Sequence, residues 1–290
     1  MTKYFSLLAI AMVLFASSCQ KKENVTSEKK ENPITLSQEY ADLQNSLYEL
    51  NQEMITSSPE TRSPRRWIAV GISDAVGAAC GFRFGGVAGS IILGALASAI
   101  EIIETQPMEN NSTVVNDLKV EEQEFQNALK TLMDQSGAQV GVFHNQVIRT
   151  VYGENSDDIP EMTTEELVPL FREALPEEYK NELSLTNEEL SESVQDLIYY
   201  PESGETTTAY IFRLGLKYPE SRQDLIVLKP ILDGIDASQS DQAALEYTTR
   251  AMAIIEHSKV ASKSKNTLLC GASVAFESKV LWNLSENQNN

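Results

Sequence analysis

The chain has 290 residues, of which 23 are Lys or Arg and 42 are Asp or Glu, so its formal net charge is −19. An acidic chain of this kind repels polyanions, so we expect no nucleic-acid partner and no general attraction to anionic lipid headgroups. The length is sufficient for one large or two small domains.

The first 18 residues have the three parts of a bacterial secretion signal. Lys3 supplies a short positive region, an apolar run extends from Phe5 to Phe15, and small residues precede Cys19. The run is too short to cross a bilayer, which takes about 20 apolar residues. The pattern ending at Cys19 resembles the lipobox of bacterial lipoproteins, with Ala16 where Leu is more common. The resemblance implies cleavage before Cys19 and its acylation, and therefore anchoring of the chain in a lipid bilayer.

Residues 19–36 are rich in Lys, Glu and Asn and have few apolar side chains. Such a segment cannot bury enough apolar surface to offset its ordering entropy, so we expect a flexible tether. Within it, Lys21-Lys22-Glu23 resembles a charged surface-export signal of Bacteroides-like bacteria, but it lacks aspartates. The expected location is the outer membrane, on its periplasmic face or at the cell surface. Cleavage would leave 22 basic and 42 acidic side chains, a net charge of −20.

A mostly helical domain is expected over residues 37–286. Its first predicted helix spans residues 37–56, where apolar residues recur at alternating spacings of three and four. These residues are Tyr40, Leu43, Leu47, Leu50 and Met54. Pro59 and Pro64 then predict a loop.

Residues 67–103 form an unusual Gly/Ala-rich segment. Small residues recur every fourth position at Gly77, Gly81, Gly85 and Gly89, and a similar row contains Ser90, Gly94 and Ser98. Residues four apart share one helical face, so such a row forms a groove in which another backbone can approach closely. Each interior Gly costs about 1 kcal/mol relative to Ala, so a helix here requires close packing in return.

Two interpretations of this segment remain open. In the first, it forms one or two buried core helices that meet the C-terminal helix near Cys270 and Gly271. In the second, it inserts into a membrane as a helix or a helical hairpin. Asp74 and Arg83 would then have to pair or line a pore, because a charge in the bilayer centre is costly.

The remainder of the chain also favours helices. Thr163 with Glu166, and Thr186 with Glu189, form capping boxes that predict two helix starts. Residues 205–218 are ambiguous, because residues 206–212 are rich in β-forming side chains although helical spacing is also present. The further predicted helices span residues 120–133, 141–152, 240–255 and 267–282.

Few residue patterns carry recognisable chemistry. The chain has no phosphate-binding GxxxxGK[ST] loop, no GxSxG elbow and no zinc-binding HExxH or CxxC spacing, so we expect no cofactor and no metal. His144 and Asn145 stand out as polar residues at the start of an apolar helix; they form either an internal hydrogen-bond clamp or a ligand contact. Cys80 and Cys270 are either buried free thiols or a disulfide, which an exported protein could form.

Three segments together resemble a group of uncharacterised lipoproteins and secreted proteins of Bacteroides-like bacteria. They are Ser73–Ala78, Phe143–Asn145, and Ala272–Ser278 followed by Leu281–Asn283. The resemblance covers about a third of the chain, and it implies an exported lipoprotein without implying an activity.

The sequence therefore predicts a lipid-anchored cell-envelope protein that acts as a non-enzymatic binding or structural module. Its expected partners are the bilayer, through acylated Cys19, and an unidentified envelope protein or glycan. The alternative is a membrane-active or pore-forming protein that inserts residues 67–103. An enzyme with a site at His144 and Asn145 is the third hypothesis.

Overall fold

The computed structural model describes residues 35–55, 65–105, 137, 139–155, 158–200 and 204–287. The predicted signal peptide, Cys19, nearly all of the tether and the predicted helix 120–133 lie outside these ranges. The chain from Leu36 onwards forms one compact unit. Within the described ranges the structure is helical and contains no strand, which confirms the mainly α fold.

The longer helices match most of the helical segments predicted from the sequence. In chain order the elements are α2 (Gln38–Ile55), α3 (Arg65–Thr105), α5 (Val140–Asn155), the short 3-10 helix η2 (Ile159–Glu161), α6 (Thr164–Glu173), α7 (Glu177–Lys180), α8 (Asn187–Asp196), α9 (Thr207–Lys217), the 3-10 helix η4 (Pro219–Ser221), α10 (Arg222–Ala237), α11 (Asp241–His257) and α12 (Ser262–Asn287). The ambiguous residues 205–218 are thus helical, and α12 begins five residues before the predicted start at Thr267.

Local side-chain signals define several helix starts. The two predicted capping boxes are present: Glu166 accepts from the backbone N–H of Thr163 at 2.8 Å, and Glu189 does the same for Thr186. Ser240 caps the start of helix α11, and its hydroxyl accepts from the Ala243 N–H at 3.1 Å. Each cap satisfies backbone donors that have no partner inside the first turn of the helix.

The Gly/Ala-rich segment folds as a hairpin of two helical arms within α3. The first arm runs to Phe84 and the second resumes at Val87, because Gly85 and Gly86 have non-helical backbone angles. Gly86 has φ +61°, a left-handed conformation that glycine adopts without a Cβ clash. The sequence placed Gly85 on the helical face of Gly77, Gly81 and Gly89 and left open whether the segment forms one helix or two. The structure has two helical arms, and Gly85 lies in the turn between them. A Cβ at Gly85 would contact Leu185 at 3.3 Å, not the opposite arm.

The two arms of the hairpin approach each other at their glycines. A Cβ added to Gly81 would overlap the carbonyl of Gly89, and one added to Gly89 would overlap the carbonyl of Gly81. Farther from the turn, a Cβ at Gly77 would lie 2.7 Å from the Leu93 carbonyl oxygen. The absent side chains therefore allow backbone-to-backbone contact, which is what offsets the low helix propensity of glycine.

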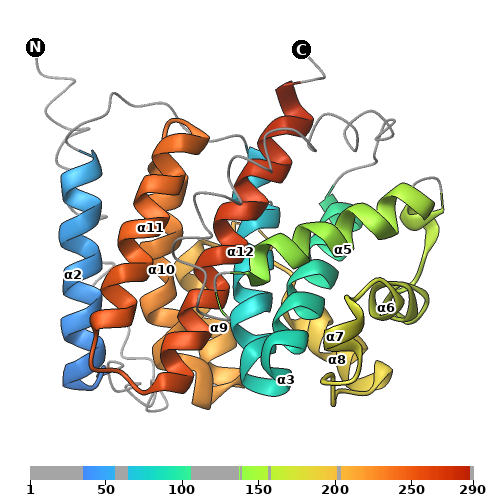
Figure 1. Cartoon of the computed structure of the whole chain (residues 1–290), viewed down its shortest axis with the longest axis horizontal. Coiled ribbons are helices and arrows are strands. Elements are labelled where there is room, and N and C mark those ends of the chain that lie inside the picture. Colours follow the sequence, from blue (N-terminus) through green and yellow to red (C-terminus); the bar gives the residue numbers. More distant parts are fainter. Residues whose placement is uncertain are drawn as a thin grey trace, which may run out of the picture. The chain divides into compact units, whose positions relative to one another are not determined.

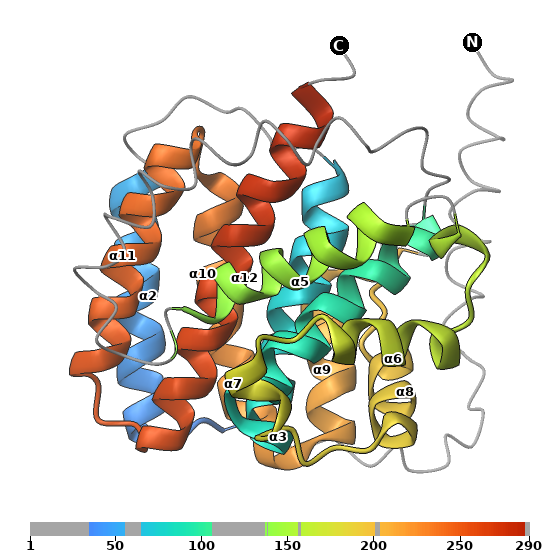
Figure 2. The ribbon, with the colours of Figure 1, turned by 45° about the vertical axis from the view of Figure 1, so that its right-hand side comes forward.

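Helix α12 covers the hairpin and is itself buried over most of its length. Its contact with α3 is the most extensive between any two helices, and α5 crosses both of them (Figures 1 and 2). At Gly271 an added Cβ would lie 3.2 Å from the Ala75 carbonyl oxygen, so α12 and the first arm also approach closely. This is the contact near Gly271 that the core interpretation of the segment expected.

Amphipathic helices complete the enclosure. Helices α2, α10 and α11 contact one another, while α10 and α11 also pack on α12, and α6 and α8 pack on α3 (Figure 1). Asn51 of α2 joins two of these helices, since it donates to the Pro230 carbonyl of α10 and accepts from Tyr247 of α11. By length and composition Val70–Glu101 could cross a membrane, but 78% of its apolar window is buried within the protein.

We predict that Gly81→Ala destabilises the domain by about 3 kcal/mol, because the new methyl group overlaps backbone atoms that cannot move without separating the arms. Urea unfolding followed by circular dichroism measures the change. Gly153→Ala is the matched control: Gly153 is exposed in α5, and its added Cβ would meet nothing within 4 Å. The control should be neutral or stabilising by up to about 1 kcal/mol. Equal effects of both substitutions would contradict the close approach of the arms.

Candidate functional site

A cluster of polar side chains lies in the core where α3, α5 and α12 meet. Each of its members is at most 5% exposed. They are Asp74 and Ser98 on the two arms of α3, His144 and Asn145 on α5, and Glu277 and Ser278 on α12. Because unpaired buried polar groups are costly, the hydrogen bonds among these residues decide what the cluster can do.

Asp74 is the acceptor at the centre of this cluster. Its Oδ2 accepts from the hydroxyl of Ser98 at 3.0 Å and from that of Ser278 at 2.6 Å. The Nε2 of His144 lies 3.5 Å from the same oxygen. One carboxyl group thereby connects both arms of the hairpin with α12 and α5.

Asn145 orients the imidazole of His144. The Asn145 amide donates from Nδ2 to the backbone oxygen of Glu277 at 3.0 Å and to its Oε2 at 2.9 Å. Its Oδ1 is therefore an acceptor, and it lies 3.1 Å from Nδ1 of His144. The proton of a neutral imidazole then resides on Nδ1, and Nε2 faces Asp74 as an acceptor.

Burial disfavours the charged form of both members of the Asp74–His144 pair. Desolvation raises the pKa of Asp74 well above its usual value, although the hydroxyls of Ser278 and Ser98 act in the opposite direction. Desolvation also lowers the pKa of His144 to about 4, against a smaller upward effect of Asn145. The burial of both groups therefore favours a neutral acid beside a neutral imidazole over an ion pair.

This arrangement contains Asp, His and Ser side chains but does not have the geometry of a nucleophilic triad. In such a triad the imidazole accepts a hydrogen bond from the nucleophile. Here both serine hydroxyls donate to the carboxyl group of Asp74, and His144 is 0% exposed. The geometry favours an internal clamp over a ligand or catalytic contact.

The absence of a side chain at Gly94 provides the space that the imidazole of His144 occupies. A Cβ on Gly94 would lie 3.0 Å from Cδ2 of His144 and 3.2 Å from the Asp74 carbonyl oxygen. Gly94, which the sequence placed in a packing row, therefore makes room for a ring of α5 as well as for the first arm of the hairpin.

Other polar residues of the hairpin are also paired. Glu101 accepts from the Ser73 hydroxyl and from the backbone N–H of Tyr199, both at 3.0 Å. Arg83 donates from Nε to Oδ2 of Asp224 at 2.8 Å. The sequence singled out Asp74 and Arg83 as charges in an apolar segment that would have to pair or line a pore on insertion, named no partner for either, and did not identify Glu101. An isolated polar residue in such a run was the available signal that a buried partner exists.

Cys80 and Cys270 are free, fully buried thiols, so the disulfide that the sequence left open is not formed. The two side chains face different neighbours. The charges of Arg83 and Asp224 act on the pKa of Cys80, whereas Ser90 is the hydrogen-bond neighbour of Cys270. Burial raises the pKa of each thiol to about 12, which leaves both in the unreactive protonated form.

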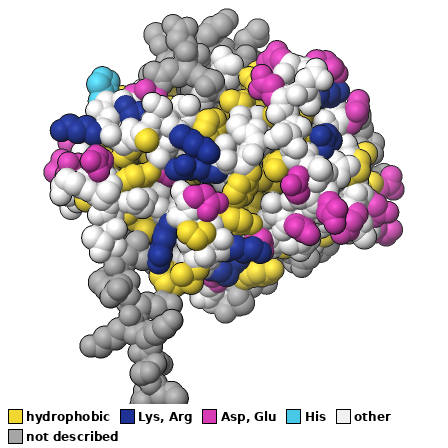
Figure 3. Space-filling model, turned by 90° about the horizontal axis from the view of Figure 1, so that it is seen from below, with side chains coloured by type: hydrophobic (Ala, Val, Ile, Leu, Met, Phe, Trp, Pro, Cys, Tyr) yellow, Lys and Arg dark blue, Asp and Glu magenta, His cyan; other side chains and the backbone are white. Residues whose placement is uncertain are grey.

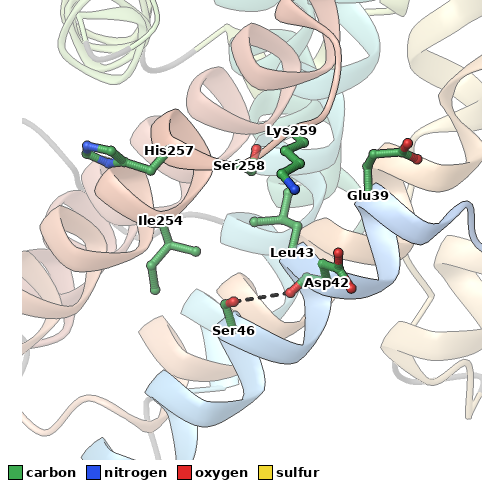
Figure 4. Close-up of a pocket in the computed structure, with 8 residues that line it drawn as sticks. All are labelled: Glu39, Asp42, Leu43, Ser46, Ile254, His257, Ser258 and Lys259. Carbon is green, nitrogen blue, oxygen red and sulfur yellow. Dashed lines mark hydrogen bonds between the residues drawn. The ribbon is translucent and has the colours of Figure 1, made fainter.

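A separate surface pocket of about 320 Å³ lies between the start of α2 and the end of α11 (Figure 4). Its lining combines acidic Glu39 and Asp42 with basic Lys259 and with His257, so charges of both signs are present. Among the described residues, no group of three or more His, Cys, Asp or Glu side chains could hold a metal ion. None of the candidate site residues predicted from the sequence lines this pocket, and its lining residues do not form a recognisable catalytic arrangement.

No protein-family model, curated protein or solved structure matches this chain. A function can therefore be proposed only from the residues and their arrangement.

We expect His144 to make the folded state sensitive to acid. Its pKa is about 4 when folded, against about 6.5 when unfolded, so between these values only the unfolded chain binds the proton. The contribution is complete above about pH 6.5 and is lost toward about pH 4, with a total of about 3 kcal/mol.

The measurement is the unfolding free energy of the wild-type protein minus that of the His144→Gln variant, at several pH values. Burial raises the pKa of Asp74, so its contribution has the opposite pH dependence, but Asp74 is present in both proteins and its effect largely cancels. The difference should decrease from about pH 7 to about pH 4.5. A difference independent of pH would show that His144 is not held neutral by burial.

Thiol labelling tests the state of the cysteines. In the mature chain carrying Cys19→Ala, we expect a maleimide to label neither remaining thiol under native, non-reducing conditions, because both are buried. After unfolding in guanidinium chloride without reductant, both Cys80 and Cys270 should react. Failure of both to react after unfolding would indicate a disulfide.

Proposed function

We propose that this chain is a lipid-anchored, non-enzymatic helical module of the bacterial cell envelope, and that its Gly/Ala-rich segment serves as the packing core of that module. The observation that carries the proposal is that the small-residue faces of the helices pack against one another: Gly81 contacts Gly89, and Gly271 contacts Ala75. A segment whose close-packing faces are already occupied has no free groove for association in a bilayer.

The cluster around His144 supports the non-enzymatic part of the proposal. Its groups are buried, they bond to one another, and they connect α3, α5 and α12. A hydrogen-bonded cluster of this kind specifies how helices with smooth Gly/Ala surfaces align, because a shift of one turn would separate the partners. The role of Cys19 rests on the sequence alone.

One observation favours a second function, insertion of the hairpin into a membrane. The two arms of α3 contain about 20 residues each and are therefore about 30 Å long, close to the thickness of a bilayer core. A tight turn joins them, and amphipathic helices surround them. Insertion would have to break the contacts with α12 and α5 and the bonds of Asp74 and Glu101.

A two-part experiment separates these functions. In a Bacteroides-like host given an alkyne-tagged fatty acid, the wild-type chain should acquire the label and Cys19→Ala should not. The purified mature chain carrying Cys19→Ala is then mixed with liposomes and extracted with alkaline carbonate. We expect the protein in the soluble fraction, because its apolar hairpin stays buried. Resistance to extraction would support insertion, and an unlabelled wild-type chain would exclude the lipid anchor.

A further inference from the structure

The turn of the hairpin reaches the surface at one end of the domain. Residues 82–87 are partly exposed, whereas most of the rest of the hairpin is fully buried. Arg83 fixes this turn in place, because it bonds to Asp224 and Ser264, which lie in the first turns of α10 and α12. Phe84 packs against Tyr218, just beyond the end of α9, with ring centroids 5.1 Å apart. The apolar turn is thus held where α9 ends and α10 and α12 begin.

We call this end of the domain the tip face. Its apolar part contains the turn and Leu216, which is 50% exposed. Basic residues stand on the helix ends that surround the turn, and these are Lys217, Arg222, Lys263 and Lys265. Lys217 also pairs with Asp196, the Lys265 ammonium also donates to the carbonyl oxygen of Glu256, and exposed Glu220 lies between Lys217 and Arg222 in the chain. Figure 3 shows hydrophobic side chains gathered in the middle of the lower face with Lys and Arg beside them, while acidic side chains are concentrated toward one side.

The tether enters the domain at the same face. The backbone N–H of Ser37, just before α2, donates to Gln223 in the first turn of α10 at 2.8 Å. Cys19 precedes Ser37 by 18 residues, a length that spans at most about 60 Å when fully extended. A bilayer that holds Cys19 therefore stays within that distance of the point where the chain joins the tip face.

We propose that the tip face docks on the bilayer in which Cys19 is anchored, with the apolar turn and Leu216 at the headgroup boundary and the surrounding lysines and arginine toward lipid phosphates. The proposal rests on the lipid anchor proposed above.

Apolar side chains bordered by Lys and Arg are the usual composition of interfacial anchors. The acidic side chains at one side of this face are repelled by phosphates, so that side would lie farther from the bilayer (Figure 3). Tethering raises the local concentration of the bilayer, so an interaction too weak to hold the free protein is sufficient once the chain is anchored.

Tryptophan quenching tests the docking without depending on acylation in cells. The mature chain, produced without lipid, is coupled through its Cys19 thiol to a maleimide lipid in vesicles of phosphatidylethanolamine and phosphatidylglycerol. Cys80 and Cys270 are buried, so coupling is selective for Cys19. The probe is Leu216→Trp, and the matched control is Tyr48→Trp, an exposed position (42%) in the second half of α2. The signal of the parent protein is subtracted, because it contains two tryptophans.

With brominated lipids, the added fluorescence of Leu216→Trp should fall to about half, and that of Tyr48→Trp should stay nearly unchanged. Adding Lys217→Glu and Lys263→Glu to the Leu216→Trp protein should restore most of its fluorescence. Equal quenching of both probes, or of neither, would overturn the proposal. If neither probe is quenched and the tethered proteins associate through Leu216, a second copy of the chain occupies the face instead of the bilayer. Because the anchor is chemical, none of these results depends on whether the cell acylates Cys19.

Discussion

The backbone contact between Gly81 and Gly89 is the constraint on which the rest of this fold depends. It brings two apolar helices closer together than side chains of any size would allow, and it requires a turn as short as Gly85–Gly86. The resulting hairpin offers flat, side-chain-poor surfaces to its neighbours. Helix α12 can therefore lie against the first arm at Gly271, and α5 can place a histidine ring over Gly94. Glycine spacing, usually associated with membrane helices, here organises a core enclosed by amphipathic helices.

Smooth surfaces pack closely but define alignment poorly, and the buried polar groups compensate for this weakness. Asp74 accepts from Ser278 of α12, Arg83 donates to Asp224 of α10, and Glu101 accepts from the backbone N–H of Tyr199 in the segment after α8, so each bond fixes one neighbour of the hairpin in register. Similar logic applies where Lys279 of α12 donates to the carbonyls of Ile235 and Ser238 at the end of α10. Apolar burial supplies most of the driving force, while these bonds select one arrangement among several with comparable apolar contact.

Sequence reasoning succeeded where the signal was local. The spacing of apolar residues located α2 and α11, and Thr–Glu pairs located the starts of α6 and α8. It left open one helix or two and did not locate the Gly85–Gly86 turn, because a four-residue glycine spacing is the same in one helix and in two facing arms. Residues 262–266 carry no apolar periodicity, so the start of α12 was predicted too late. The candidate site depends on partners distant in sequence: Asp74 and Ser278 are 204 residues apart, and no local pattern reports such a pair.

The two free thiols, described above as chemically inert, also constrain how the chain reaches its folded state. Their protection exists only in the folded state, because the unfolded chain exposes both sulfur atoms, and the export proposed above would place them in an oxidising compartment. Cys80 belongs to a hairpin with short-range contacts that can form early, whereas Cys270 must wait for a helix 190 residues later. For the exported chain proposed above, α12 must therefore pack into the core before an oxidant reaches Cys270.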